Sequence, residues 1–350
     1  MFPDVSRLRV LAVVPALNEE KHILGLLVSL ARECKDFASM RIVVVDGGSS
    51  DGTATLVERF RGRHPEVVLL RNPARIQSAA LNLAVRRFGA EADILVRCDA
   101  HSSYPDGYCR LLAESLFATA ADAVVVPMDS LGTETCWQKA VARVSNSAIG
   151  TGGSAHRAGR KSGFVDHGHH AAFRIEAFLK AGGYDESFTH NEDAELDCRQ
   201  RALGARIYLD SRIRVGYQPR SSLGALWRQY RRYGAGRSRT IRRHPRSARL
   251  RQLAVPAHLL VSLLALAVSP WFPLALVWPA SYLTVLAGAS IVFALRERAP
   301  CLLWSGLAAG VMHSAWATGF LTGLITSREQ VWTVERALPL VPERQSVSTE

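Results

Sequence analysis

The chain has 350 residues, enough for one large domain with a smaller appendage or for two ordinary domains. Lysine and arginine total 43 against 31 aspartates and glutamates, a formal charge of +12. The charge is densest over residues 228–251, directly before a long apolar region, which favours anionic lipid over nucleic acid as the partner. Six cysteines without a C-x-x-C pair argue against a disulfide framework or a structural zinc site, and they predict a reducing compartment.

Short apolar strands alternate with amphipathic helical patterns over the first half of the chain. The expected strands cover residues 9–16, 41–48, 66–72 and 92–100. Buried apolar strands with helices between them indicate a mainly parallel, Rossmann-like α/β sheet with helices on both faces. Ligands of such sheets bind beyond the carboxyl ends of the strands, so we expect Asn18, Asp46 and Asp99 to converge in one crevice.

Three apolar stretches follow the basic segment, and they predict C-terminal transmembrane helices. They cover residues 253–269, 274–295 and 301–325, and the first is at the lower limit of a spanning length. Three spans would place the tail on the outside, whereas a re-entrant first stretch would return it to the inside, so the number of spans stays open. The first twenty residues lack a basic n-region and a spanning apolar run, so we expect no signal peptide and a cytosolic catalytic portion.

Two polar segments suggest chemistry at the strand ends. The turn DGGSSDGT after the second strand begins with Asp46 and is neither a G-x-G-x-x-G motif nor a P-loop, so simple dinucleotide or ATP binding is not supported. The segment NEDAELDCRQRALG places Glu192, Asp193 and Glu195 at an expected helix start. Acidic residues there can be partners of the helix dipole, or one of them can be a general base.

In chain order, the pieces VVPALNEE, VVVDGGSSDGT, CDAH, NEDAELDCR and QYRRY resemble glycosyltransferase family 2. The members of this family are inverting nucleotide-sugar transferases with a GT-A fold. The resemblance covers about residues 8–245, and it looks nearest to a membrane-anchored branch of exopolysaccharide-synthesis glucosyltransferases.

The resemblance implies a donor site at the strand ends. Pro15, Asn18 and Glu19 match the nucleotide site of the first strand, and Asp46 matches the aspartate that binds uracil and ribose.

The resemblance also implies a divalent metal, Mg²⁺ or Mn²⁺. Asp99 matches the first aspartate of the D-x-D-like metal motif, and His101 stands where the second aspartate usually lies. His101 is therefore expected to be a metal ligand or a donor to the pyrophosphate, with a bystander role as the alternative.

The acceptor side is implied by three further segments. Asp193 matches the catalytic base, and Glu192 shapes the acceptor side. The residues that match the family's Q-x-x-R-W element are Gln229, Arg232 and Tyr233, with tyrosine replacing tryptophan, which weakens a processive-synthase interpretation. Residues expected to meet acceptor hydroxyls or a lipid pyrophosphate are His167 and His169, with Asp166 as a secondary candidate; a zinc site formed with His170 is the alternative.

These expectations combine into one interpretation. The chain would comprise a cytosolic GT-A domain (1–227), a basic juxtamembrane segment (228–252), a membrane region of about three helices (253–326) and a polar tail (327–350). It would transfer a sugar, glucose first among the candidates, from a UDP-sugar to a lipid-linked (polyprenyl-diphosphate) saccharide at the bacterial inner membrane. The alternatives are a polyprenyl-phosphate glycosyltransferase, a processive polysaccharide synthase, a non-catalytic membrane scaffold and a nucleic-acid-binding protein.

Overall fold

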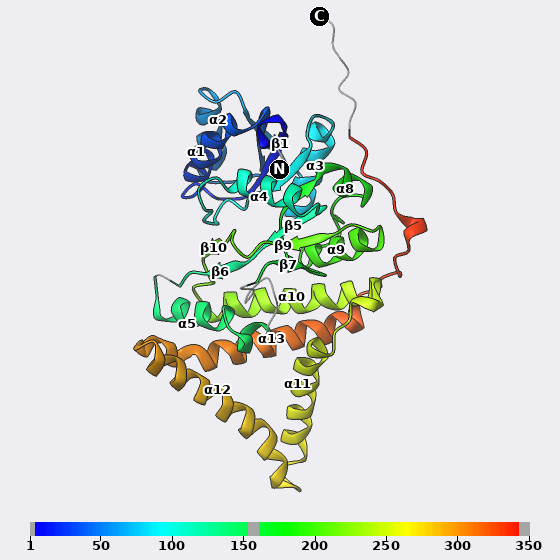
Figure 1. The fold of residues 1–350 in the computed structure, drawn as a ribbon. Helices are drawn as coiled ribbons and strands as arrows, with labels where there is room; N and C mark the ends of the chain where they lie inside the picture. Colours follow the sequence, from blue (N-terminus) through cyan, green and yellow to red (C-terminus); the bar gives the residue numbers. More distant parts are fainter. Residues whose placement is uncertain (1–3, 133, 153–160, 343–350) are drawn as a thin grey trace, which may run out of the picture. The chain divides into compact units, whose positions relative to one another are not determined.

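The computed structural model describes residues 4–132, 134–152 and 161–342, and the chain divides into two compact units. The first unit comprises Met1–Met128, Gly159–Val215 and Thr333–Glu350, and the second comprises Asp129–Ala158 and Gly216–Trp332. The first unit is a sheet covered by helices, and the second is mainly helical (Figure 1).

The first unit contains an eight-stranded sheet in the order β3-β2-β1-β4-β8-β5-β9-β7. Its strands are β1 (Arg9–Ala16), β2 (Ser39–Asp46), β3 (Val67–Arg71), β4 (Ile94–Arg97), β5 (Ala123–Val126), β7 (Gly163–Phe164), β8 (His169–Arg174) and β9 (Ile207–Leu209). The pairs among β1 to β4 are parallel, and β8 is antiparallel to both of its neighbours. The predicted α/β sheet is therefore confirmed, with β8 reversed in its middle and β7 reversed at its edge.

Helices cover both faces of this sheet. They are α1 (Ile23–Glu33), α2 (Thr53–Arg61), α3 (Gln77–Phe88), α4 (Tyr108–Ala118), α8 (Ile175–Lys180) and α9 (Glu192–Ala202). Alternate residues of β1 enter opposite cores: Val10, Ala12 and Val14 pack in the core that contains α1 and α4. Leu11 and Val13 pack in the core that contains α3 and α8. Burial on both faces explains why the strand is a continuous apolar run.

The second unit is built from helices. They are α5 (Cys136–Ser145), α6 (Ala148–Thr151), α10 (Leu223–Arg243), α11 (Leu250–Val268), α12 (Val277–Arg296) and α13 (Ser305–Thr326). A separate two-stranded sheet pairs β6 (Met128–Ser130) with β10 (Val215–Tyr217). In the described residues, two segments are long and apolar enough to cross a membrane, Leu250–Val268 and Pro273–Arg296, and both are largely exposed. The third apolar stretch forms α13, which has many buried residues.

A disulfide joins Cys136, at the start of α5, to Cys301, in the short 3₁₀ helix Pro300–Trp304. The sequence argued against a disulfide framework, and the structure nevertheless joins this one pair. The two residues are 165 positions apart, so no local spacing could reveal the pairing, and their Cα atoms approach to 4.7 Å only through the packing of the second unit. Cys34, Cys98, Cys109 and Cys198 are free thiols.

Candidate active site

The carboxyl ends of β1 and β2 lie side by side, because Ala16 pairs with Asp46 in the sheet register. The Asp46 carboxylate accepts hydrogen bonds from the backbone N–H groups of Gly48 (3.0 Å) and Ser49 (3.1 Å) and from the Ser49 hydroxyl (2.5 Å). Gly48 has φ +83°, which favours glycine at this turn. The loop after β2 is therefore folded around the Asp46 carboxylate.

A second set of hydrogen bonds ties the loop after β1 to the loop after β2. The Asn18 side-chain oxygen accepts from the Ser50 N–H (2.8 Å), and the Asn18 N–H donates to the Ser49 hydroxyl (2.9 Å). The Glu19 N–H donates to the Thr53 hydroxyl at the start of α2 (2.8 Å). The structure thus ties Asn18 and Glu19 to the loop of Asp46, while Pro15 lies within β1. The convergence of Asn18 and Asp46 with Asp99 in one crevice stays a prediction.

Asp99 follows β4, the strand on the other side of β1. Its carboxylate accepts from Gln77 Nε2 (2.5 Å) and from Arg97 Nε (3.0 Å). His101 lies two residues further along, and its Nδ1 is 2.8 Å from Glu19 Oε1. In the parts of the chain that are described, no group of three or more histidine, cysteine, aspartate or glutamate side chains is arranged to hold a metal.

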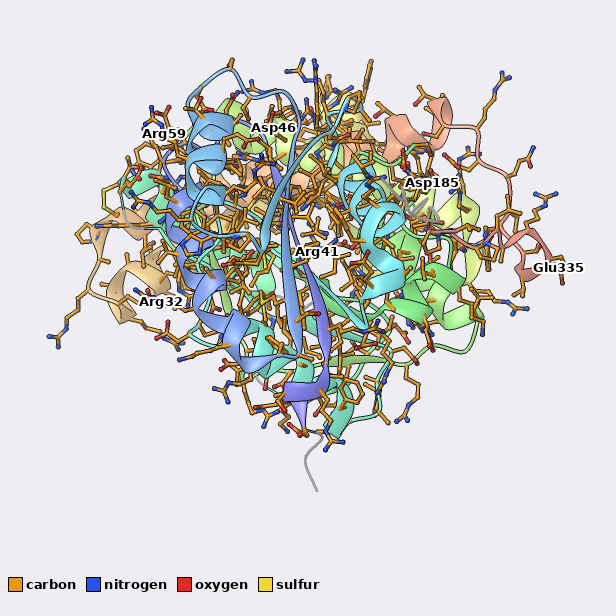
Figure 2. The ribbon with its side chains drawn as sticks, turned by 90° about the horizontal axis from the view of Figure 1, so that it is seen from above. Arg32, Arg41, Asp46, Arg59, Asp185 and Glu335 are labelled. Atoms are coloured by element: carbon orange, nitrogen blue, oxygen red, sulfur yellow. A yellow bond between two sulfur atoms is a disulfide. The ribbon has the colours of Figure 1, made fainter. Side chains whose placement is uncertain are left out.

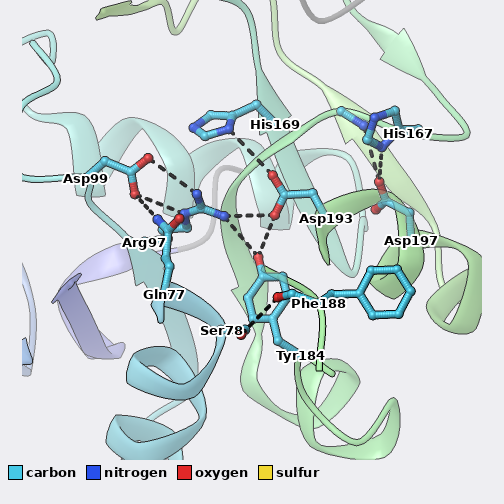
Figure 3. Close-up of polar contacts among 11 residues, drawn as sticks. Gln77, Ser78, Arg97, Asp99, His167, His169, Tyr184, Phe188, Asp193 and Asp197 are labelled. Carbon is cyan, nitrogen blue, oxygen red and sulfur yellow. Dashed lines mark hydrogen bonds and ion pairs between the residues drawn. The ribbon is translucent and has the colours of Figure 1, made fainter. Parts of the chain in front are cut away.

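Arg97, the last residue of β4, is a buried charged residue of the site, and the sequence patterns did not predict it or its neighbours Gln77 and Tyr184. Its guanidinium is 5% exposed and bridges two carboxylates, with Nε 3.0 Å from Asp99 and Nη1 2.8 Å from Asp193 (Figure 3). Burial tends to lower the pKa of Arg97, but Asp99 and Asp193 outweigh it and hold that pKa well above its usual value. An arginine inside the otherwise apolar run ILVRC was the available signal, since a buried charge requires partners.

Asp193 lies in the first turn of α9 and receives several polar contacts. Besides Arg97, the Tyr184 hydroxyl donates to its Oδ1 (3.0 Å), and His169 Nδ1 lies 3.7 Å from its Oδ2 (Figure 3). Arg97 also lies 3.5 Å from the Tyr184 hydroxyl. The carboxylate is thus oriented by groups from β4, β8 and the segment before α9.

The carboxyl groups of this cluster differ in acidity. Burial and the neighbouring Asp193 charge raise the pKa of Glu192 to about 7. Burial also acts to raise the pKa of Asp99, but Arg97 and His169 outweigh it and lower that pKa below its usual value. The site therefore holds one carboxyl that is ionised at neutral pH beside another that keeps its proton up to about pH 7.

The histidines of the segment before β8 have separate partners. His167 Nδ1 is 2.7 Å from Asp197 Oδ2, and the Gly168 N–H also reaches that oxygen (3.3 Å). Asp197 is fully buried, so it fixes the ring of the half-exposed His167. Asp166 pairs at the surface with Arg201 at 2.8 Å. The side chain of His170 lies outside the described residues.

The three residues of the Q-x-x-R-Y element lie on α10, in the second unit. Gln229 is buried and donates through Nε2 to the Tyr233 hydroxyl one turn later (2.9 Å), while Arg232 is exposed. Their participation in the site stays a prediction.

Replacing Arg97 by methionine should lower the Tm of the detergent-solubilised protein by about 6–12 °C, as expected for roughly 3 kcal/mol in a domain of this size. The substitution leaves two largely buried carboxylates without their shared cation. The control is Arg41→Met on β2, whose pair with Glu91 is solvent-accessible and should contribute at most about 1 kcal/mol. Equal losses for the two variants would contradict a bridging role for Arg97.

Glu192→Gln should raise Tm relative to wild type increasingly as the pH rises from about 5 to 8. A carboxyl with a raised pKa binds its proton more tightly in the folded chain, so the wild type loses stability as the pH rises through its folded pKa of about 7. Glutamine cannot ionise and removes this loss. Differential scanning fluorimetry at several pH values checks the trend, with the exposed Glu186→Gln as control; a pH-independent difference would refute the assignment.

Comparison with known proteins places this geometry in a family. Residues 11–182 match the model of Glycosyl transferase family 2. The chain is 44% identical over 324 residues to the succinoglycan biosynthesis protein ExoA of Rhizobium meliloti, an alignment that covers 92% of this chain and 96% of that protein. The fold is similar to that of the mannosyltransferase PcManGT from Pyrobaculum calidifontis, solved in complex with GDP-Man and Mn²⁺, with TM-score 0.59 and 20% identity over 92% of this chain and 88% of that one. The chain therefore belongs to glycosyltransferase family 2 and is a glycosyltransferase with a GT-A fold.

Proposed function

We propose that this enzyme transfers a sugar, glucose first among the candidates, from a UDP-sugar to a hydroxyl of a lipid-linked saccharide in bacterial exopolysaccharide synthesis. The observation that carries the proposal is the Arg97 bridge, which holds Asp193 beside the strand end that bears Asp99. The identity of 44% with a succinoglycan biosynthesis protein supports the choice of pathway.

The donor nucleotide would bind across the ends of β1 and β2. Asp46 would accept hydrogen bonds from the uracil or ribose. Its own loop supplies three donors, the Gly48 and Ser49 N–H groups and the Ser49 hydroxyl, whereas a carboxylate can accept about four. Pro15, Asn18 and Glu19 would form the neighbouring wall of the nucleotide site. The bonds that tie Asn18 to the loop after β2 would hold this wall in place before the donor arrives.

The residues present fit a divalent cation that takes most of its ligands from the donor. Asp99 offers one carboxylate of low pKa, and magnesium or manganese commonly binds through one or two carboxylates together with substrate phosphates and water. His101 would act through Nε2, at the metal or at the pyrophosphate, since its Nδ1 contacts Glu19. When bound, the ion would neutralise charge on the leaving diphosphate.

Asp193 would be the general base. It would remove the proton from the acceptor hydroxyl, whose oxygen forms the new bond to the anomeric carbon while the bond to the diphosphate breaks on the opposite face. Arg97 and Tyr184 would orient the carboxylate, and the charge of Arg97 would favour its ionised form. A diphosphate needs no proton to leave, so the second carboxylate of a glycoside hydrolase is not required.

The acceptor would be met by two groups of residues. His167, fixed by buried Asp197, and His169, beside Asp193, would contact acceptor hydroxyls or a lipid pyrophosphate. Gln229, Arg232 and Tyr233 would contribute from α10. The apolar helices α11 and α12 support a location at the bacterial inner membrane, with the catalytic unit in the cytoplasm.

Asp193→Asn should lower kcat by about 10²–10⁴ and leave the Kd for the UDP-sugar within about threefold, because the amide cannot accept the proton. The measurement uses membranes that contain the protein, a panel of labelled UDP-sugars and analysis of the lipid product. Glu186→Gln, a surface substitution in the same unit, is the control. Full transfer activity of Asp193→Asn would show that Asp193 is not the general base. A lipid product with only one sugar unit would favour a polyprenyl-phosphate acceptor instead of a lipid-linked saccharide.

His101→Ala should reduce transfer activity more with Mn²⁺ than with Mg²⁺, and His101→Asp should shift the preference toward Mg²⁺. Imidazole suits manganese better than magnesium, whereas a carboxylate suits both. Activity is titrated against each metal, with the exposed His22→Ala as the control. If neither substitution changes activity or metal preference, His101 is a bystander.

A further inference from the structure

The segment after α13 returns to the first unit through residues 338–340. The Leu340 N–H donates to the Leu179 carbonyl oxygen (2.9 Å), and the Leu340 side chain packs against the buried core that includes Phe178. The Leu338 carbonyl lies so close to Gly182 that a Cβ atom there would clash, and Gly182 has φ +82°. The segment after α13 is thus built into the catalytic unit. Because the chain both leaves and rejoins this unit, it must cross any membrane an even number of times in between.

Helix α10 is not suited to cross a membrane. It carries seven arginines: Arg228, Arg231, Arg232, Arg237, Arg239, Arg242 and Arg243. Each arginine at the centre of a bilayer costs about 2.5–3.5 kcal/mol on insertion scales, so this helix must remain outside the hydrocarbon.

Helix α13 packs lengthwise on α10, with which it runs side by side (Figure 1). Three glycines allow the close approach, because a Cβ at each would clash: Gly234 against Trp316, Gly319 against Arg231, and Gly323 against Ser238. Beyond the end of α13, Glu329 pairs with Arg243 at 2.7 Å and also with Arg239. A helix held along an arginine-rich partner shares its location, which removes α13 from the candidate spans.

Helices α11 and α12, the remaining candidate spans, form a hairpin whose charged residues lie at its open end. Helix α11 has 19 residues and α12 has 20, so each extends about 28–30 Å, close to the ~30 Å thickness of the hydrocarbon layer. Arg249 and Arg251 lie at the start of α11, and Arg296 and Arg298 lie at the end of α12. The turn at 269–276 has no charged residue, and its Trp271 is 83% exposed.

From this combination we infer that α11 and α12 cross a lipid bilayer as a two-span hairpin. The turn at 269–276 lies on the far side, while α10, α13 and the C-terminal tail lie on the side of the catalytic unit. The arginines at both open ends of the hairpin then face the cytoplasm, as the positive-inside rule requires. The inference deepens the proposed membrane location, and it does not depend on which sugar is transferred.

Cysteine labelling of the full-length protein in intact spheroplasts tests this topology. Ser269→Cys, at the end of α11, should react with a membrane-impermeant maleimide at least tenfold more than the wild-type chain, which supplies the background of its four free cysteines. Ser327→Cys, directly after α13, should react only after lysis. Trp271→Cys, at the most exposed position of the turn, replaces Ser269→Cys if that variant fails to react in lysed membranes.

The outcomes separate the possible topologies. Labelling of both positions in intact spheroplasts would show an odd number of crossings and overturn the hairpin. If neither position reacts before lysis and both react afterwards, the turn lies on the same side of the membrane as residue 327. That result would also overturn the hairpin. Transfer activity, measured on the same membranes, reports independently on the proposed reaction.

Discussion

The geometry of the site depends on one buried guanidinium. Arg97 is almost wholly removed from solvent, and its charge is balanced by Asp99 on one side and Asp193 on the other. A buried charge without such partners would cost several kcal/mol. This cost holds the end of β4 next to the start of α9. The bridge connects the end of β4 to the start of α9, which bears the candidate base, and its Arg97 and Asp193 are 96 residues apart in sequence. Figure 2 shows the side chains packed around the sheet that contains β4.

A second acidic residue, Glu192, directly precedes Asp193 at the start of α9. Asp193 faces the guanidinium, while Glu192, in a buried setting beside the Asp193 charge, has its pKa raised to about 7. A Glu192 carboxyl that keeps its proton up to about pH 7 can donate a hydrogen bond, which a carboxylate cannot.

The second unit combines one strongly basic helix with helices whose surfaces are apolar. Its arginine-rich helix α10 must remain in contact with water or headgroups, whereas α11 and α12 expose apolar side chains along almost their whole length. Glycines at the contact between α10 and α13 allow an apolar helix to be buried against a basic one. An apolar stretch of sufficient length is therefore not by itself a membrane span, because a neighbouring helix can provide its apolar environment instead.

Sequence alone determined the α/β sheet, the order of the family's segments, and the meeting of Asn18 with the Asp46 loop. These follow from local periodicity and from a geometric rule, since parallel strands bring their carboxyl ends to one edge. Only the tertiary structure decided the Arg97 bridge, the pairing of His101 with Glu19, the Cys136–Cys301 disulfide and the burial of α13. Each of these depends on the partner that a side chain meets across the fold, and a partner distant in sequence leaves no periodic trace.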